Sequence, residues 1–228
     1  MWRTGLDLIG CPRWSFSSPI FTLFLTPPPS LKPQLIPSLL LLIALAATAL
    51  AQTHHITAVP YTVTDTGVYV LDNSVVGTIQ ISASNVTLDL GGNTLVGSVV
   101  ATHVMRVVIQ NGILDSGAEF AALDFNNVVS GKVSNLVLTG GISLFDCSGV
   151  LVGNNSIIGM PPAIYSGLSP QGTSSRLANS FQANSVSVWP TVAGLATPMT
   201  LSPFDAYSSN MFPGFPAGVT PVTGGVKQ

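Results

Sequence analysis

Two aspartates are the residues best placed for chemistry in this sequence. Asp124 and Asp146 lie 22 residues apart, close to the interval at which short strands recur along the chain. If they occupy equivalent places on successive turns of a coil of strands, their carboxyl groups lie about 5 Å apart. Such a pair could share a proton, bind a cation or act as the two acids of a retaining glycosidase. The alternative is that loops of unequal length put the two residues out of phase, with each carboxylate solvated.

Other reactive residue types form no recognisable centre. Cys147 is the one cysteine after residue 51, and its strand-like surroundings indicate a small buried hydrophobe, since no positive neighbour in sequence would favour a thiolate. No set of His, Cys and carboxylate residues has zinc-site spacing, and no nucleophile elbow marks a serine triad. We therefore expect no metal, no cofactor and no catalytic residue beyond the candidates Asp124 and Asp146.

The composition excludes several classes of protein. Hydrophobic residues make up 46% of the 228 residues and charged residues only 7%, whereas about 25% is usual. Beyond residue 51 the chain holds eight acidic and four basic residues, which is a net charge of −4. Four scattered bases cannot build the basic stripe that nucleic acids require, nor a basic patch for anionic lipids. We therefore expect no nucleic-acid partner.

A short unit, Asn-x-(Leu/Ile/Val), recurs along the chain with alternating apolar residues before it. It begins at Asn93, Asn111, Asn135, Asn155 and Asn184, with spacings of 18, 24, 20 and 29 residues. The first three spacings bracket the twenty or so residues in one β-helix turn, and the last indicates a loop inserted between 161 and 172. Asparagine tolerates the positive φ of a corner, and stacked amides can form a hydrogen-bonded ladder. The sequence therefore predicts a structural ladder of these five asparagines.

The residues around each unit alternate with a period of two. Val86, Leu88 and Leu90 fall on one face of a strand, and Thr87 and Asp89 fall on the other. Glycines and β-branched residues interrupt every window that a helix would need. The pattern predicts an all-β protein, a single parallel β-helix of about five or six short turns over residues 67–189.

A family resemblance accompanies this pattern. The stretch Ile81–Leu95 resembles the repeating turn of right-handed parallel β-helix proteins, the pectate-lyase-like superfamily, and the resemblance runs from about Tyr61 to Trp189. It implies a right-handed coil, and many relatives act on acidic polysaccharides. Their lyases use clustered carboxylates for calcium with an Arg or Lys base, and their hydrolases use neighbouring Asp residues with Gly-His-Gly and Arg-x-Lys. None of these signatures stands in this sequence.

The N-terminal segment resembles an export signal. Leu39–Leu50 form a 12-residue apolar run, too short to span a bilayer, and small residues precede a cleavage point between Ala51 and Gln52. We expect residues 1–51 to be a signal segment, with residues 1–30 reflecting a start called too early. The competing reading is an uncleaved signal anchor. No later run could span a membrane, so we expect no stable span after cleavage.

The segments that flank the coil are expected to close its ends. A solenoid needs caps because an open end exposes apolar core and unpaired strand edges. Residues 52–66 are the expected N-terminal cap. Residues 190–228, which contain six prolines, are the expected C-terminal cap or an extended tail. Two glycosylation sequons begin at Asn85 and Asn154.

Three hypotheses about function fit these observations. The first is a secreted, non-catalytic β-helix, a surface, adhesion or glycan-binding module whose partner is an extracellular glycan or cell-surface component. The second is a polysaccharide lyase or glycoside hydrolase with a degenerate site, which requires Asp124 and Asp146 side by side. The third is a fragment of a longer repeat protein. Low charge and absent catalytic signatures favour the first.

Overall fold

The computed structural model describes the part of the chain that follows the predicted signal. The chain divides into two units, Met1–Ala49 and Leu50–Gln228, and every described residue belongs to the second. The described ranges are 52–116, 121–160, 162–168, 178–188, 197–213 and 221–228. The predicted signal segment with Ala51 lies outside them, as do residues 161 and 169–172 of the loop expected between 161 and 172. The prediction of a loop is wrong for the rest of that stretch, because Ile164–Gly167 form a strand that pairs in parallel with Ile142–Phe145. No helix within these ranges is both long and apolar enough to cross a membrane.

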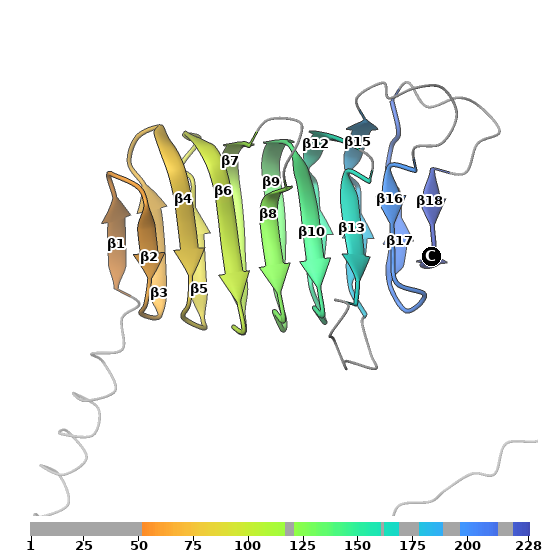
Figure 1. Cartoon of the computed structure of the whole chain (residues 1–228), viewed down its shortest axis with the longest axis horizontal. Helices are drawn as coiled ribbons and strands as arrows, with labels where there is room; N and C mark the ends of the chain where they lie inside the picture. The colour runs from red at the N-terminus through yellow and green to blue at the C-terminus, as the bar shows by residue number, and fades with distance from the viewer. Residues whose placement is uncertain (1–51, 117–120, 161, 169–177, 189–196, 214–220) are drawn as a thin grey trace, which may run out of the picture. The chain divides into compact units, whose positions relative to one another are not determined.

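The described elements are strands that stack into a parallel β-solenoid of about 7 turns (Figure 1). Each turn adds strands to three rows, called rows A, B and C in the order in which the chain visits them, and neighbours within a row pair in parallel. This confirms the predicted all-β solenoid, with more turns than the five or six expected. The extra turns come from both ends of the coil.

Row A contains the strands that open each turn. They are β1 (Thr53–Ile56), β3 (Gly67–Leu71), β5 (Val86–Asp89), the first half of β7 (Val107–Asp115), the first half of β9 (Lys132–Thr139), β11 (Leu151–Gly153), β14 (Ser180–Gln182), β17 (Ala206–Ser208) and β19 (Val226–Lys227).

Row C contains the strands that close each turn, and their succession is visible along the long axis in Figure 1. They are β2 (Tyr61–Val63), β4 (Val75–Ile81), β6 (Thr94–Thr102), β8 (Ala121–Asn126), β10 (Gly141–Phe145), β13 (Ile164–Gly167), β16 (Met199–Thr200) and β18 (Val222–Thr223). Row B lies between them. It consists of the first residues of β4 and β6, the second halves of β7 and β9, β12 (Ser156–Gly159) and β15 (Ser185–Val188).

The alternation of apolar and polar residues explains the core. Val86 and Leu88 are buried and Thr87 is half-buried on the outer side, as the period of two predicts. In row C one buried apolar residue per turn stacks directly on the next. This column consists of Ile79, Val99, Leu123, Ile142, Ile164, Met199 and Val222. Each turn therefore buries its apolar side against its two neighbours, which makes the core continuous.

Strands occur on both sides of the range 67–189 that the sequence predicts for the coil. Residues 52–66, expected to be a cap, contain β1 and β2, which pair with β3 and β4 as a regular turn. The expected tail, 190–228, contains β16 to β19, which continue rows A and C. The prediction was too narrow because strands of two to four residues show too little alternation to be recognised.

Cys147 belongs to a column of small apolar residues at the corner between rows C and A. The residues that follow Val104, Val128 and Cys147 form bridges to one another, so these three side chains occupy equivalent corner positions. All three are buried, and the thiol donates to the carbonyl oxygens of Phe125 at 3.4 Å and Phe145 at 3.2 Å. Burial raises the pKa of the Cys147 thiol to about 12, which keeps it protonated at neutral pH.

This environment predicts an inert thiol. At pH 8 the native protein should not react with a thiol-specific chromogenic reagent, whereas the denatured protein should release one equivalent of chromophore. Cys147→Val should change the free energy of unfolding by less than about 1.5 kcal/mol, because valine already occupies the same corner on the two preceding turns. Rapid labelling of the folded protein would contradict the assignment.

Candidate functional site

The register of row C determines where the two candidate aspartates lie. Asp124 of β8 pairs with Ser143 of β10, while Asp146 follows the end of β10, three residues beyond Ser143. At about 3.3 Å per residue, this offset separates them by about 10 Å along the strands. The stacked pair predicted from the 22-residue spacing is therefore wrong. The turn between β8 and β10 advances by 19 residues at this position, not 22.

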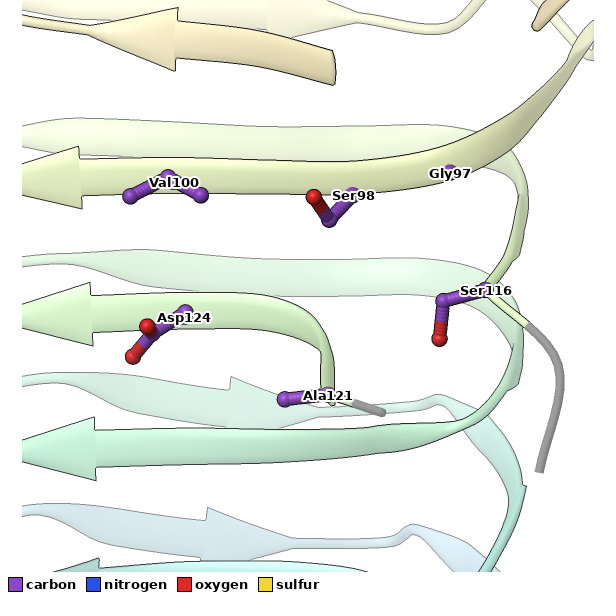
Figure 2. Close-up of a pocket in the computed structure, with 6 residues that line it drawn as sticks. All are labelled: Gly97, Ser98, Val100, Ser116, Ala121 and Asp124. Carbon is purple, nitrogen blue, oxygen red and sulfur yellow. The ribbon is translucent and has the colours of Figure 1, made fainter. Parts of the chain in front are cut away.

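Asp124 instead lines a pocket of about 380 Å³ on the outer side of row C. Figure 2 shows its carboxyl group on β8, with Ser98 and Val100 on the neighbouring β6. The described lining residues are Gly97, Ser98, Val100, Ser116, Ala121 and Asp124. The described lining of the pocket thus comes from β6, from β8 and from Ser116, which follows β7.

The Asp124 carboxyl group is poorly solvated. Its Oδ1 atom is buried and has no hydrogen-bond partner. Burial raises the pKa of this carboxyl group, and no other cause accompanies the burial. Among the described residues no donor thus satisfies Oδ1, although a carboxyl group offers several acceptor positions.

Two aromatic side chains lie on the same outer side of row C. Phe145 of β10 and Tyr165 of β13 are half-buried, and their ring centroids are 5.1 Å apart with the planes at 47°. They point outward because their strand neighbours, such as Leu144 and Ile164, are fully buried. Tyr165 lies over Gly167, where a β-carbon would come within 2.6 Å of the phenol oxygen. Gly167 therefore leaves room for the ring to lie along the sheet.

The aspartate, a serine and the tyrosine share one line across row C. Asp124 pairs with Ser143, and Ser143 pairs with Tyr165, so the three residues occupy one outward column on consecutive strands. Phe145 stands two residues beyond Ser143 on the same side of β10. We call Asp124, Ser143, Phe145 and Tyr165 the row C face. It combines aromatic surface, a hydroxyl group and a carboxylate on three neighbouring strands.

The charge of this face is acidic. The Lys and Arg residues that the structure describes belong to row A or to the corner before it. They are Arg106, Lys132 and Lys227. The described part of the row C face carries Asp124, with Asp146 at its end, and no cationic side chain. A polyanionic ligand would find no counter-charge there.

Four of the five asparagines of the predicted ladder are linked side chain to side chain, but in two separate pairs, of which one is buried. Asn155 and Asn184 are buried, and the Asn155 Nδ2 donates to Asn184 Oδ1 at 3.0 Å. Asn184 Nδ2 in turn donates at 3.0 Å to Oδ1 of Asn210. The repeat unit did not include Asn210 because Phe212 stands where the unit has Leu, Ile or Val. Each amide also donates to the carbonyl oxygen of a core residue one turn before it. The ladder is structural and lies at the corner between rows A and B.

The other three asparagines have different roles at that corner. Asn111 and Asn135 themselves adopt positive φ, 59° and 57°, and their side chains are linked at 3.4 Å. Asn93 donates to the carbonyl oxygen of Leu71 at 2.7 Å. These three residues therefore shape the corner but do not extend the buried ladder.

The sequon asparagines are placed where a glycan could be attached. Asn85 and Asn154 are both exposed, with φ of 58° and 59°, at opposite ends of row A strands. Their modification stays a prediction.

Among the described residues, no group of three or more His, Cys, Asp or Glu side chains could hold a metal ion.

Comparison with known proteins does not assign the site. No protein-family model, no curated protein and no solved structure matches this chain. The interpretation of the row C face therefore rests on its own residues.

Proposed function

We propose that this protein is a secreted, non-catalytic β-solenoid that binds an extracellular or cell-surface glycan on the row C face. The observation that carries the proposal is the outward pair Phe145 and Tyr165 beside the Asp124 pocket. Aromatic rings pack against the apolar faces of sugar rings, and a few nearby polar groups orient the hydroxyl groups. A carboxylate and a serine next to the rings supply those polar groups.

The separation of the two aspartates supports binding over catalysis. Glycoside hydrolysis needs two carboxyl groups on opposite sides of one bond, and retaining enzymes hold them about 5 Å apart. Asp146 lies three residues out of register with Asp124, so the pair does not have the close spacing of a retaining centre. Among the described residues no second carboxyl group pairs with Asp124 across row C, and the aromatic pair with one carboxylate favours recognition of a sugar.

The proposal also includes export from the cell and membership of the pectate-lyase-like superfamily. The apolar run Leu39–Leu50 before Ala51 supports export, and a low charge with a Ser/Thr/Asn-rich exterior suits an extracellular surface protein. The resemblance of Ile81–Leu95 to pectate-lyase-like repeats supports a right-handed coil of that superfamily. Their acidic substrates do not fit the charge of the row C face.

The test is a glycan-binding screen of the secreted full-length product, followed by titration of the best ligand with Tyr165→Ala. We expect wild type to bind at least one glycan and the variant to bind roughly tenfold more weakly, because loss of a stacked ring removes about 1–2 kcal/mol. Phe204→Ala is the matched control, since Phe204 is 62% exposed and lies outside the row C face. Absence of any glycan ligand, or equal affinity of a folded Tyr165→Ala protein, would refute the proposal.

A further inference from the structure

No described group donates a hydrogen bond to the Oδ1 atom of Asp124. The Asp124 side chain lines the pocket, while Oδ1 itself is buried in the protein, and this burial raises the pKa of the carboxyl group. A desolvated carboxylate is stabilised most by a charge-assisted bond from a cation. A cationic group bound in the pocket would supply such a bond to the part of the Asp124 carboxyl group that lines it.

A second group in the pocket can share such a donor. The Ser98 hydroxyl lines the pocket on β6 and lies 3.4 Å from the Thr78 hydroxyl, which belongs to the preceding turn. A hydroxyl group carries one donor and two acceptor positions, so this contact leaves an acceptor position on Ser98. An ammonium group with three donors could bond to Asp124 and Ser98 together.

The surroundings of the pocket also select for positive charge. Asp146 follows Phe145 at the end of β10, and the described cations lie in or next to row A. Aromatic faces attract cations through their quadrupoles, and no described Lys or Arg competes for Phe145 and Tyr165 on this face. The carboxyl group of Asp124, whose Oδ1 has no described partner, and the aromatic surface without a described cation are independent observations. Both indicate a positively charged ligand.

We propose that the Asp124 pocket receives the protonated amino group of an amino sugar, so that the ligand is a glycan with free, non-acetylated amino groups. The inference rests on the proposed glycan-binding function and adds the chemical class of the ligand. Asp124 and Tyr165 are two strand spacings apart, about 10 Å. The amine of one sugar unit would bond to Asp124 while a further unit stacks on Tyr165.

The experiment compares matched oligosaccharides by calorimetric titration against the full-length secreted protein. The probes are a glucosamine oligomer, its fully N-acetylated form, a glucose oligomer with the same linkage, and an oligogalacturonate. We expect the glucosamine oligomer to bind at least about tenfold more tightly than the acetylated and neutral forms, as one charge-assisted bond allows. The oligogalacturonate should bind most weakly.

Variants separate this inference from the general proposal. Asp124→Asn should reduce the affinity for the glucosamine oligomer about tenfold and the affinity for the acetylated oligomer by much less, so that the preference between the two is lost. Asp124→Ser, which also removes the charge, should give the same loss. Tyr165→Ala should weaken both ligands. Asp65→Asn is the matched charge control, since Asp65 is exposed outside the pocket, and it should change neither affinity.

The results of these titrations distinguish failure of the amino-sugar inference from failure of the glycan-binding proposal. Equal affinity for free and acetylated oligomers, or a folded Asp124→Asn protein with wild-type preference, overturns the amino-sugar inference. If binding then still depends on Tyr165, the glycan-binding proposal survives. Binding to none of the four probes, together with no ligand in the wider screen, overturns both.

Discussion

Asn184→Ala should lower the free energy of unfolding by about 3–5 kcal/mol, the largest loss expected from any polar side chain of the described structure. The Asn184 amide is fully buried and bonded on both sides. Its Nδ2 donates to the carbonyl oxygen of Val152 at 2.9 Å and to Asn210 Oδ1 at 3.0 Å. Its Oδ1 accepts from both the backbone N and Nδ2 of Asn155, at 3.1 and 3.0 Å. Alanine would leave these partners unsatisfied inside the coil.

Urea unfolding followed by circular dichroism measures this loss. The matched control is Asn154→Gly, at the same type of corner one turn earlier. Asn154 is exposed with φ of 59°, a conformation that glycine adopts readily, so the control should change stability by less than about 1 kcal/mol. A loss below 1 kcal/mol for Asn184→Ala would mean that the ladder contributes no more than an exposed polar residue does.

The ladder also shows how far sequence alone predicts this fold. The repeat unit located the corner between rows A and B correctly, since each of its five asparagines lies there. The repeat unit does not distinguish two kinds of asparagine. Asn135 itself adopts positive φ, whereas Asn155 follows a residue that does, Asn154. Only the second kind turns its amide into the core. Backbone conformation, not residue type, makes that distinction.

The ends of the coil were harder to predict than its middle. Alternation is clear in strands such as Val86–Asp89, and these were located well. A strand such as Met199–Thr200 holds one buried and one outward residue, which is too short for a period to appear. It belongs to row C because it pairs with Ile164, which lies 35 residues earlier in the chain. No regular spacing in the sequence indicates that pairing.

The site depends on register, which the sequence did not reveal. Successive row C partners are separated by 20 residues at Gln80 and Val100, 24 at Val100 and Asp124, and 19 at Asp124 and Ser143. No constant spacing identifies neighbours in such a coil, so the assumed Asp124–Asp146 pair failed. Phe145 did carry a usable signal, because it follows buried Leu144 in the outward phase of its strand.

Gly97→Ala should be the most damaging single-methyl change, with an expected loss above about 4 kcal/mol or no secreted protein. Gly97 lies where β6 bends from row B into row C, with φ of 145°, and it pairs with Gly77 of the preceding turn. A β-carbon at Gly97 would lie 2.0 Å from the backbone oxygen of Gly77. Backbone atoms cannot rotate away as a side chain can, so β4 and β6 must separate and lose hydrogen bonds in the longest strands of row C.

The control for this clash is Gly92→Ala, which separates backbone strain from steric overlap. Gly92 also has positive φ, 80°, but a β-carbon there meets nothing within 4 Å. Alanine at Gly92 should therefore cost only about 1 kcal/mol, the usual price of a left-handed conformation for a residue with a β-carbon. Secretion yield and the urea midpoint of both variants measure the difference. Equal losses would show that φ alone governs these glycines and that the rows tolerate a methyl group between turns.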